Sequence, residues 1–215
     1  MSAASDSASS DEAHEVIRFW FGPQPYGLQT IRERERLWFG VSTGEQQRGA
    51  IDELIRERFA GLMQRAAAGE LARWAGGSHR RLALILLLDQ FPRNAHRGTA
   101  RAFATDEAAL TLALSGIQAG ADATLSPLER VFLYMPLQHA ERLDVQEESV
   151  AAYLRLFEEA PTELRPFLAG VQRFASRHLA IIRRFGRFPH RNQALGRAST
   201  PEELVFFRHP ERFSH

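Results

Sequence analysis

The amino-acid sequence predicts an all-α protein, and three observations support this class. Apolar residues recur at steps of three and four over long stretches, and residues that favour helix ends stand at the borders of these stretches. No stretch shows the apolar–polar alternation that is typical of a half-buried strand. We therefore expect about eight to ten helices, with no substantial sheet, in which short connections make successive helices antiparallel neighbours.

The length and composition suit one globular domain. The chain has 215 residues, of which 44% are hydrophobic and 25% are charged, so it can bury a core without disulfides. Residues 1–10 are small and polar, and we expect a disordered tail there, followed by a single helical domain over residues 11–215. The start lacks the basic region and apolar core of a signal peptide, and no apolar run reaches the length of a membrane span. We expect a cytoplasmic protein that does not bind membranes.

The first half of the chain contains helical patterns separated by glycine and proline. Apolar residues at helical spacing define amphipathic helices, whereas the run LALILLL is apolar on all sides and predicts a central buried helix that begins near Ser78. The expected helices run from a cap at Asp11 to Gly22-Pro23, over TIRERERLWFG (residues 30–40), from Thr43 or Gly44 to about Gly69, and around residues 82–88.

The second half carries clearer start signals. Ser126-Pro127-Leu128-Glu129 has the pattern of a capping box, with proline at the first helical position. From Thr162 onward, large apolar residues recur at steps of four and three, so we expect the face that carries them to be buried. We expect helices that begin at Thr105, Ser126, Thr162 and Thr200, and one more helix over residues 144–160. The buried face of the helix from Thr162 is expected to hold Phe167, Val171, Phe174, His178, Ile181 and Phe185.

The charged residues exclude several kinds of chemistry. The chain has no cysteine, and all 27 of its basic residues other than histidine are arginine. Thiol nucleophiles, disulfides, lysine Schiff bases and the lysine of a phosphate-binding loop are therefore excluded. The net charge of +1 gives no basic surface for nucleic acid. Any fixed positive charge at a site must come from arginine or protonated histidine, and we expect no cofactor.

Two polar segments resemble each other. Phe91-Pro92-Arg93-Asn94 recurs as Phe188-Pro189-His190-Arg191-Asn192, with one residue inserted, and each segment follows a strongly apolar helix. Chance explains so short an echo as readily as design. The alternative is a pair of helix-end loops that face each other across the bundle.

Asp89 is the first candidate site residue. It lies three and seven residues after Leu86 and Leu82, on the face that these leucines bury. A buried carboxylate is costly unless it is paired, so we expect an arginine beside it, although Pro92 is expected to end the helix before Arg93. One interpretation is that Asp89 anchors the arginine loop to the helix end. The other is that it orients an arginine toward an anionic ligand.

The histidines give further candidates. In YMPLQHAER, Pro136 is expected to break or kink the helix and to redirect His139 and Glu141, which diverge on a regular helix. A histidine that is hydrogen-bonded in the core is the plainer interpretation of His139, and the same holds for His178. His190 follows a proline and precedes Arg191, whose charge disfavours imidazolium, so His190 is a candidate base near neutral pH.

The motif-bearing stretches together resemble the uncharacterised, mainly bacterial family known as domain of unknown function 924. They are VIRFWFG, LALILLLDQFPRNAHRGTARAFATD, YMPLQHAE and FGRFPHRNQALGRAST followed by PEE, and they run from about residue 14 to 208. The resemblance implies a tetratricopeptide-like, α-α superhelix-type bundle and implies no activity. It places the motif groups at Asp89, Arg93, Asn94, Arg97, Gly98, His139, Glu141, Arg187, His190, Arg191, Asn192 and Gly196.

The favoured functional hypothesis is a pocket where the two Phe-Pro loops and the kinked segment converge on a small anionic ligand, a carboxylate or a phosphate. If there is turnover, hydrolysis or proton transfer fits the absence of lysine and cysteine. The candidate catalytic residues are His139, His190, Asp89 and Glu141, and the candidate ligand-binding residues are Arg93, Asn94, Arg97, Arg187, Arg191 and Asn192.

Two other functions stay open at this point. A tetratricopeptide-like groove can present a concave surface to a peptide, although a fold alone does not establish this. A metal site formed by His139, Glu141 and either His190 or His178 is the second alternative. The substrate, the presence of any catalysis and the oligomeric state do not follow from the sequence.

Overall fold

The computed structural model describes residues 3–40 and 44–208, and side chains from Asp11 onward. These residues form helices and turns without a strand, which confirms the all-α, single-domain prediction. The α-helices are α1 (Ala3–Phe21), α2 (Leu28–Phe39), α3 (Glu45–Ala67), α4 (Ser78–Ile85), α5 (Phe91–Ala95), α6 (Asp106–Gln118), α7 (Pro127–His139), α8 (Leu143–Glu159), α9 (Arg165–Phe185) and α10 (Pro201–Arg208).

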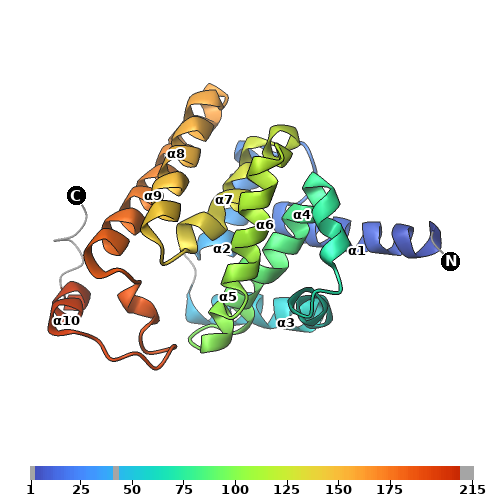
Figure 1. The fold of residues 1–215 in the computed structure, drawn as a ribbon. Coiled ribbons are helices and arrows are strands. Elements are labelled where there is room, and N and C mark those ends of the chain that lie inside the picture. Colours follow the sequence, from blue (N-terminus) through green and yellow to red (C-terminus); the bar gives the residue numbers. More distant parts are fainter. Residues whose placement is uncertain (1–2, 41–43, 209–215) are drawn as a thin grey trace.

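The helices form a central bundle with a C-terminal extension on one side (Figure 1). α4 packs against α1, α6 and α7, and α3 packs beneath α5. α8 and α9 form the hairpin at the left of Figure 1, and α7 joins this hairpin to the bundle. α10 lies beyond the end of α9, away from the central helices. This arrangement brings α2, α3, α5, α7 and α9 around one cavity.

The first helix begins earlier than the sequence predicts. α1 starts at Ala3, so Asp11 lies inside the helix and does not cap it, and the expected tail over residues 1–10 is corrected from Ala3 onward. Alanine has the highest helix propensity, and several alanines precede Asp11. Residues 3–10 therefore extend α1, and the core stabilises this helix from Ala13 onward.

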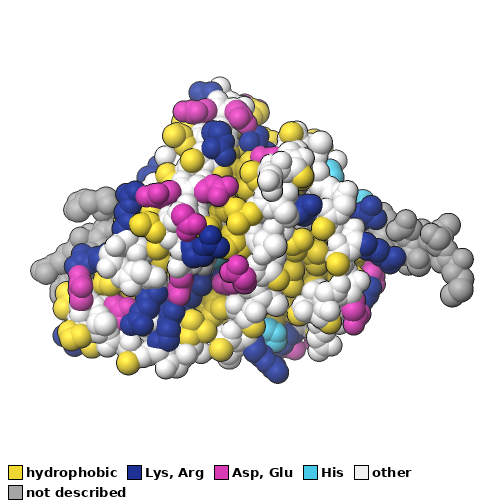
Figure 2. All heavy atoms as spheres, in the orientation of Figure 1, with side chains coloured by type: hydrophobic (Ala, Val, Ile, Leu, Met, Phe, Trp, Pro, Cys, Tyr) yellow, Lys and Arg dark blue, Asp and Glu magenta, His cyan; other side chains and the backbone are white. Residues whose placement is uncertain are grey.

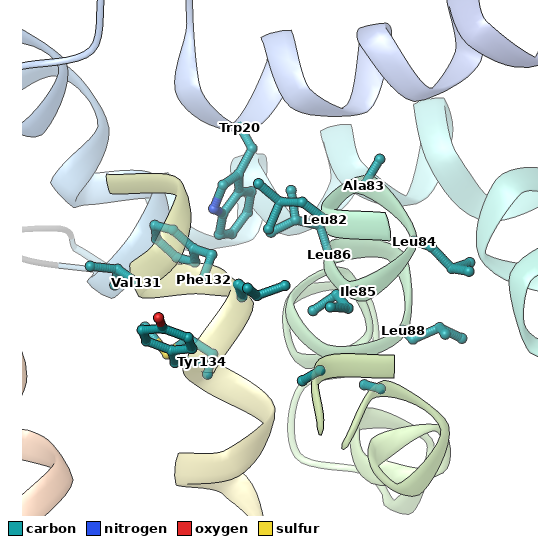
Figure 3. Close-up of a cluster of buried hydrophobic side chains, with 14 of the residues drawn as sticks. Trp20, Leu82, Ala83, Leu84, Ile85, Leu86, Leu88, Val131, Phe132 and Tyr134 are labelled. Atoms are coloured by element: carbon teal, nitrogen blue, oxygen red, sulfur yellow. The ribbon is translucent and has the colours of Figure 1, made fainter. Parts of the chain in front are cut away.

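The apolar run around residues 82–88 is the buried centre of the bundle, as predicted. Leu82, Ile85 and Leu86 are fully buried, and Figure 3 shows Leu82 and Leu86 beside the ring of Trp20. Trp20 also packs edge-on against Phe132 of α7, with ring centroids 5.5 Å apart. These contacts hold the following turn, which carries Asp89 and Gln90, inside the core.

A π-helical turn, Leu86–Gln90, connects α4 to α5. The prediction that Pro92 ends the helix is wrong, because Pro92 lies in the first turn of α5, where a missing N–H costs little. The chain therefore continues as helix through Arg93. The wider turn places the side chain of Asp89 inside the protein, and π-helical turns of this kind are frequent at functional sites.

The start signals of the second half are confirmed at two helices. Ser126 and Glu129 form a reciprocal capping box at α7, in which the Ser126 N–H donates to Glu129 Oε2 over 2.8 Å. At α10 the Thr200 N–H donates to Glu203 Oε2 over 2.7 Å, and the Glu203 N–H donates to Thr200 Oγ1 over 3.2 Å. Both boxes satisfy N–H groups that a helix leaves without partners.

The buried face of α9 differs from the predicted one. Phe174 is 55% exposed and His178 is half-buried. The α9 side chains that are buried are Leu168, Val171, Ala175, Leu179 and Ile182, so the buried stripe is rotated by about one position from the expected one. The larger residues on the adjacent face form part of a cavity wall. The tetratricopeptide-like character of the helix arrangement stays a prediction.

Candidate functional site

A cavity of about 620 Å³ lies between α2, α3, α5, α7 and α9. Its volume falls in the range of small-molecule sites. One part of the lining is apolar and aromatic, and the other is polar, charged or both. The aromatic residues of the lining are Trp38, Phe39, Phe167 and Phe174, and its polar or charged residues are Glu35, Arg36, Arg48, Asp52, Gln90, Arg93, Asn94, Arg97, Gln138, His139 and His178.

An imidazole–carboxylate pair lies at the polar end of this cavity. His139 Nδ1 is 2.8 Å from Asp89 Oδ1 and 3.0 Å from Asp89 Oδ2. Asp89 is fully buried, whereas the side chain of His139 is 15% exposed. The carboxylate comes from the π-helical turn and the imidazole from the end of α7, so the pair joins two segments that lie 50 positions apart.

Arg93 completes this buried cluster. Its Nη1 is 3.0 Å from Asp89 Oδ1, and its fork donates two hydrogen bonds of 2.8 Å to the carboxylate of Asp106. Nη1 also donates to the backbone carbonyl of Asp89 over 2.7 Å. Arg93 was predicted to bind a ligand anion, but its guanidinium is already paired with two carboxylates. The arginine beside Asp89 that the sequence required is thus Arg93.

The protonation states of the pair follow from this environment. Burial alone would raise the pKa of Asp89, but the charge of Arg93 and the bond from His139 bring that pKa below its ordinary value. Burial and the positive charge of Arg93 lower the pKa of His139, and these effects outweigh the opposing effect of Asp89. At neutral pH the pair therefore consists of a carboxylate and a neutral imidazole.

The second Phe-Pro segment meets the first at Asp106. Arg191 Nη1 is 3.2 Å from Asp106 Oδ2, the carboxylate that Arg93 also binds. Arg191 Nη2 donates to the backbone carbonyl of His139 over 2.9 Å. Its guanidinium carbon lies 4.8 Å from the ring centroid of Phe103 and 4.6 Å from that of Phe188. The predicted meeting of the two loops is thus found, and it runs through a residue that the sequence did not single out.

Arg191 holds its position without facing the cavity. Burial lowers its pKa to about 10, so it stays protonated at neutral pH. Its buried Nε has no hydrogen-bond partner among the described residues. The two aromatic faces, the carboxylate of Asp106 and the carbonyl of His139 make Arg191 a connector between the C-terminal segment and the backbone of His139.

Glu141 faces away from His139. Its Oε1 accepts the backbone N–H of Phe188 over 2.8 Å, and its two oxygens accept bonds of 2.7 and 3.0 Å from Arg197. Burial opposes the ionised form, but these donors bring the pKa of Glu141 below its ordinary value. The expectation that Glu141 orients a catalytic histidine is therefore corrected. The chain leaves the helical path after His139, so residues two positions apart point to different partners.

A separate group of contacts, the C-terminal clasp, holds the segment before α10. It consists of Glu141, Arg187, Asn192, Arg197 and Glu203. Arg187 donates to both oxygens of Glu203 over 2.7 and 2.9 Å, and Asn192 Nδ2 donates to Glu203 Oε2 over 3.1 Å. Arg187 and Asn192 were expected to bind a ligand, yet they bind this carboxylate and do not line the cavity.

The first Phe-Pro segment supplies the other predicted groups. Arg97 donates to both oxygens of Asp52 on α3, over 2.8 and 3.0 Å, so its charge is also offset. Asn94 lines the cavity together with Arg97. On the face drawn in Figure 2, basic and acidic side chains likewise lie next to each other. Many of the arginines therefore form ion pairs within the fold.

The remaining histidines differ in position. His190 is exposed, its ring centroid lies 5.5 Å from that of Phe188, and it does not line the cavity. Desolvation by neighbouring groups lowers the pKa of His190, and the charge of Arg191 lowers it further. The imidazole of His190 is therefore neutral at pH 7. His178 does line the cavity. Its Nδ1 lies 2.8 Å from the carbonyl oxygen of Phe174, and burial lowers its pKa to about 4.

The proposed metal alternative does not fit this arrangement. Within residues 11–40 and 44–208, whose side chains the structure describes, no group of three or more histidine, aspartate or glutamate side chains is placed to hold a metal ion. His139 is bound to Asp89 and Glu141 to Arg197, so the two point to different partners. The expectation of a site built from His139, Glu141 and either His178 or His190 is corrected for this reason.

The sequence predicted the motif arginines but not three of the carboxylates that bind them. Asp106, Asp52 and Glu203 were read as parts of helices, yet each binds a motif arginine. Gln146 was also missed, and it donates to the carbonyls of Leu137, Gln138 and Ala140 at the end of α7. The signal that could have found Asp106 is its place after the Thr105 cap, close in sequence to the first Phe-Pro segment.

Comparisons with known proteins place this chain in a family. Residues 16–211 match the family described as "Bacterial protein of unknown function (DUF924)". Among solved structures, the chain is similar to a protein of unknown function from Agrobacterium tumefaciens, with 34% sequence identity and a TM-score of 0.75. That similarity covers 93% of this chain and 98% of the other. A search of curated proteins gave no match. Among the described helices, none has the length and apolar character that crossing a membrane requires.

The match over nearly the whole chain and the shared fold give the same assignment. The motifs that carry it lie where the helices pack around the cavity and in the C-terminal clasp. The chain belongs to the DUF924 family of bacterial proteins of unknown function.

Proposed function

We propose that the protein binds a small anionic molecule in the cavity between α2 and α9, and that His139 transfers a proton there in a hydrolysis or proton-transfer reaction. The observation that carries this proposal is the Asp89–His139 pair, with Nδ1–Oδ distances of 2.8 and 3.0 Å, at the wall of a cavity of about 620 Å³. A cytoplasmic location is part of the proposal.

The chemistry follows from the protonation states. An ionised Asp89 accepts a hydrogen bond, so it favours the tautomer of His139 that carries its proton on Nδ1. Nε2 then holds a lone pair that can accept a proton from water or from a carbon or heteroatom acid of the ligand. This is the way in which a carboxylate orients a catalytic imidazole in hydrolases of many folds. The lowered pKa keeps the imidazole unprotonated at neutral pH.

The surrounding groups support a base rather than a structural imidazole alone. His139 is partly exposed on the cavity side, whereas Asp89 behind it is not. Arg93 fixes Asp89 from the other side, and Arg191 fixes the backbone of His139. Four elements therefore hold one imidazole in a single orientation, which is the preorganisation that proton transfer in a site requires.

The tautomer and pKa of His139 give the first test. In ¹⁵N-labelled protein, long-range ¹H–¹⁵N spectra should show His139 protonated at Nδ1 and unprotonated at Nε2 at pH 7, with a pKa below 6.5, the ordinary value for histidine. An Asp89→Asn variant that stays folded should lose this preference, because an amide can also donate to Nδ1. A His139 that is protonated at Nε2, or charged at pH 7, contradicts a role as general base.

Chemical modification gives the second test. Diethyl pyrocarbonate acylates neutral imidazole, so His139 should react at pH 6–7 while the fold is intact, and peptide mass spectrometry should locate the adduct. The exposed His190 serves as the internal control for reagent activity. If His139 stays unmodified while His190 reacts, Nε2 is closed to the cavity and the proposal fails.

The peptide-scaffold alternative stays a prediction. It can be separated from the small-molecule function by the size of what binds. Short peptides with a free carboxylate would bind more tightly than the isolated acids if the cavity served as one end of a longer groove.

A further inference from the structure

The anion-binding groups of the cavity are not the arginines that the sequence motifs suggest. Arg93 is bound to Asp89 and Asp106, and Arg97 is bound to Asp52. An incoming anion would have to compete with these carboxylates. Other groups that line the cavity must therefore bind the anionic ligand of the proposed function, on which this inference rests.

Two other arginines line the same cavity. Arg36 on α2 is exposed, and its guanidinium has no ion pair or hydrogen bond with any residue that the structure describes. Arg48 on α3 is exposed as well, and its guanidinium makes a single hydrogen bond to the residues that the structure describes, of 3.3 Å to the carbonyl of Gly40. Both guanidinium groups therefore keep donors and charge for a ligand.

Both arginines lie close to the end of α2 and line the same cavity. The backbone carbonyl of Arg36 accepts the N–H of Gly40 over 3.0 Å, and Gly40 takes the left-handed conformation, with φ 64°, that closes the helix. The Arg48 side chain reaches this same glycine from α3, and an added Cβ there would come within 3.2 Å of Arg48 Nε. Gly40 thus permits the close approach of the Arg48 side chain to the end of α2.

Among the described residues, the unpaired charged side chains that line the cavity beside Gly40 carry a net charge of +1. Glu35 also lines the cavity and has no ion pair within the described part of the chain. Two arginines and one glutamate leave a net charge of one positive unit once the pairs at Arg93 and Arg97 are set aside. A single negative charge on the ligand balances this, whereas a phosphate dianion exceeds it.

The neighbouring wall is apolar and unusually open. Phe39 is 43% exposed and Phe174 is 55% exposed, and both line the cavity. The ring of Phe167 lies 6.2 Å from that of Phe39, and Trp38 lies behind them at 6.4 Å from Phe167. Aromatic side chains that stay exposed in a concave surface gain most from burial under an apolar ligand.

We propose that the ligand is an amphipathic monocarboxylate, with its carboxylate held by Arg36 and Arg48 and its hydrocarbon or aryl body lying along Phe39, Phe167 and Phe174. Arginine forks match the two oxygens of a carboxylate, and the aromatic wall begins one residue from Gly40. His139 lines the same cavity.

Direct binding tests the ligand class. Isothermal titration calorimetry with 3-phenylpropanoate and with hexanoate should show saturable binding, whereas acetate, which lacks the apolar body, and 3-phenylpropanamide, which lacks the charge, should bind at least about tenfold more weakly. Phenethyl phosphate tests the choice of anion and should also bind more weakly than 3-phenylpropanoate. If the amide or the phosphate ester binds as tightly as the carboxylate, the proposal is overturned.

Matched variants test the residues. Arg36→Gln and Arg48→Gln should each weaken binding of 3-phenylpropanoate by about tenfold, because each removes a charge-assisted bond. Arg32→Gln, an exposed position on the same helix that does not line the cavity, should leave binding unchanged. Phe174→Ala should weaken 3-phenylpropanoate binding, and Phe207→Ala, another exposed phenylalanine, should not. All five side chains are exposed, so loss of folding does not confound the comparison.

The outcome is separable from that of the general-base proposal. If 3-phenylpropanoate and hexanoate do not bind, or if the Arg36 and Arg48 variants bind them as the unaltered protein does, the ligand class is wrong while the tautomer of His139 still tests the base. If the acids bind as expected but His139 is protonated at Nε2, the ligand class holds and the base role fails.

Discussion

At the scale of single residues, Asp89 shows how a buried charge decides local structure. Its carboxylate has no exposed surface, and it is surrounded by the side chains of Gln90, Arg93 and His139. An ion is stable there only because each oxygen has a charged or polar donor. The same contacts set the tautomer of His139, so the stability of the core and the proposed chemistry depend on one side chain.

Replacing Asp89 with alanine should be strongly destabilising. The change leaves the guanidinium of Arg93 with one carboxylate in place of two and removes the partner of His139, so we expect a loss of about 3–5 kcal/mol in the free energy of unfolding. Urea denaturation followed by circular dichroism measures it. Asp144→Ala is the control, because its pair with Arg142 is on the surface and contributes little. A loss at Asp89 as small as that at Asp144 would contradict this account of the buried cluster.

His178 should make the stability fall as the pH drops below 6.5. Burial lowers its pKa to about 4 in the folded protein, whereas the unfolded chain titrates near 6.5. Between these values the unfolded state binds the extra proton, so the contribution is complete above pH 6.5 and is lost as the pH falls toward 4. The slope is at most about 1.4 kcal/mol per pH unit, and less here because His178 is partly open to solvent.

The measurement is the urea midpoint of unfolding across pH 4–7, for the unaltered protein and for His178→Gln. The variant should show a flatter dependence, with the remaining slope due to His139 and other histidines whose pKa values are lowered and, toward pH 4, to carboxylates such as Asp89 and Glu203 whose pKa values are lowered as well. His14→Gln, at an exposed position in α1, is the control. Identical slopes for the unaltered protein and the His178 variant would show that this histidine titrates normally.

At the scale of elements, the end of α7 depends on one side chain of α8. Pro136 lies inside α7, and the helix ends three residues later at His139. Gln146 is fully buried, and its Nε2 lies within 3.3 Å of the carbonyl oxygen of Leu137 and within 2.7 Å of those of Gln138 and Ala140. The last carbonyls of a helix lack donors within it, although that of Leu137 also accepts the N–H of Ala140 over 3.3 Å. A glutamine in α8 thus fixes the backbone that presents His139 to the cavity.

Gln146→Met should therefore destabilise the protein although it keeps the side-chain volume. Carbonyls that lose a donor away from water should cost about 2–4 kcal/mol in the free energy of unfolding. Gln64→Met, at an exposed position in α3, should cost less than about 0.5 kcal/mol. The two variants are compared by urea denaturation. A Gln146 variant as stable as the Gln64 variant would mean that these carbonyls find other partners.

At the scale of the whole molecule, the C-terminal clasp joins a peripheral segment to the bundle. Glu203 accepts bonds from Arg187, Asn192 and the backbone of Thr200, and the hydrogen bonds from Arg187 are the main reason why its pKa falls to about 2. Glu141, at the end of α7, accepts the backbone N–H of Phe188. Arg191, which belongs to the same C-terminal segment, reaches the backbone of His139.

Breaking the clasp should release the C-terminal segment without unfolding the bundle. In Glu203→Ala, amide hydrogen exchange should accelerate over residues 186–208 and remain slow in α4 and α7, because the clasp and the core share few contacts. Glu202→Ala is the matched control, since Glu202 forms only an exposed pair with Arg184. Exchange that accelerates throughout the protein would show that the clasp and the core unfold together.

Much of the architecture was predictable because it depends on local patterns. The all-apolar run around Leu86, the capping boxes at Ser126 and Thr200 and the amphipathic helices are each written within a few turns of sequence. The start of α1 and the buried face of α9 were predicted wrongly. For α9, packing against distant helices, which local periodicity does not contain, decided which residues are buried. For α1, the alanines before Asp11 favour helix more strongly than the small polar composition suggested.

The candidate site was predictable in its chemical character but not in its membership. The sequence by itself determined that any cation must be arginine or histidine, that Asp89 is buried with an arginine, and that the motif stretches belong together. Only the tertiary structure decided which carboxylate meets which arginine. It assigns Asp106 to Arg93 and Arg191, Asp52 to Arg97 and Glu203 to Arg187, and it leaves Arg36 and Arg48 open at the cavity. The reason is that a charge pair requires two side chains within about 4 Å of each other, and helices far apart in sequence supply that proximity.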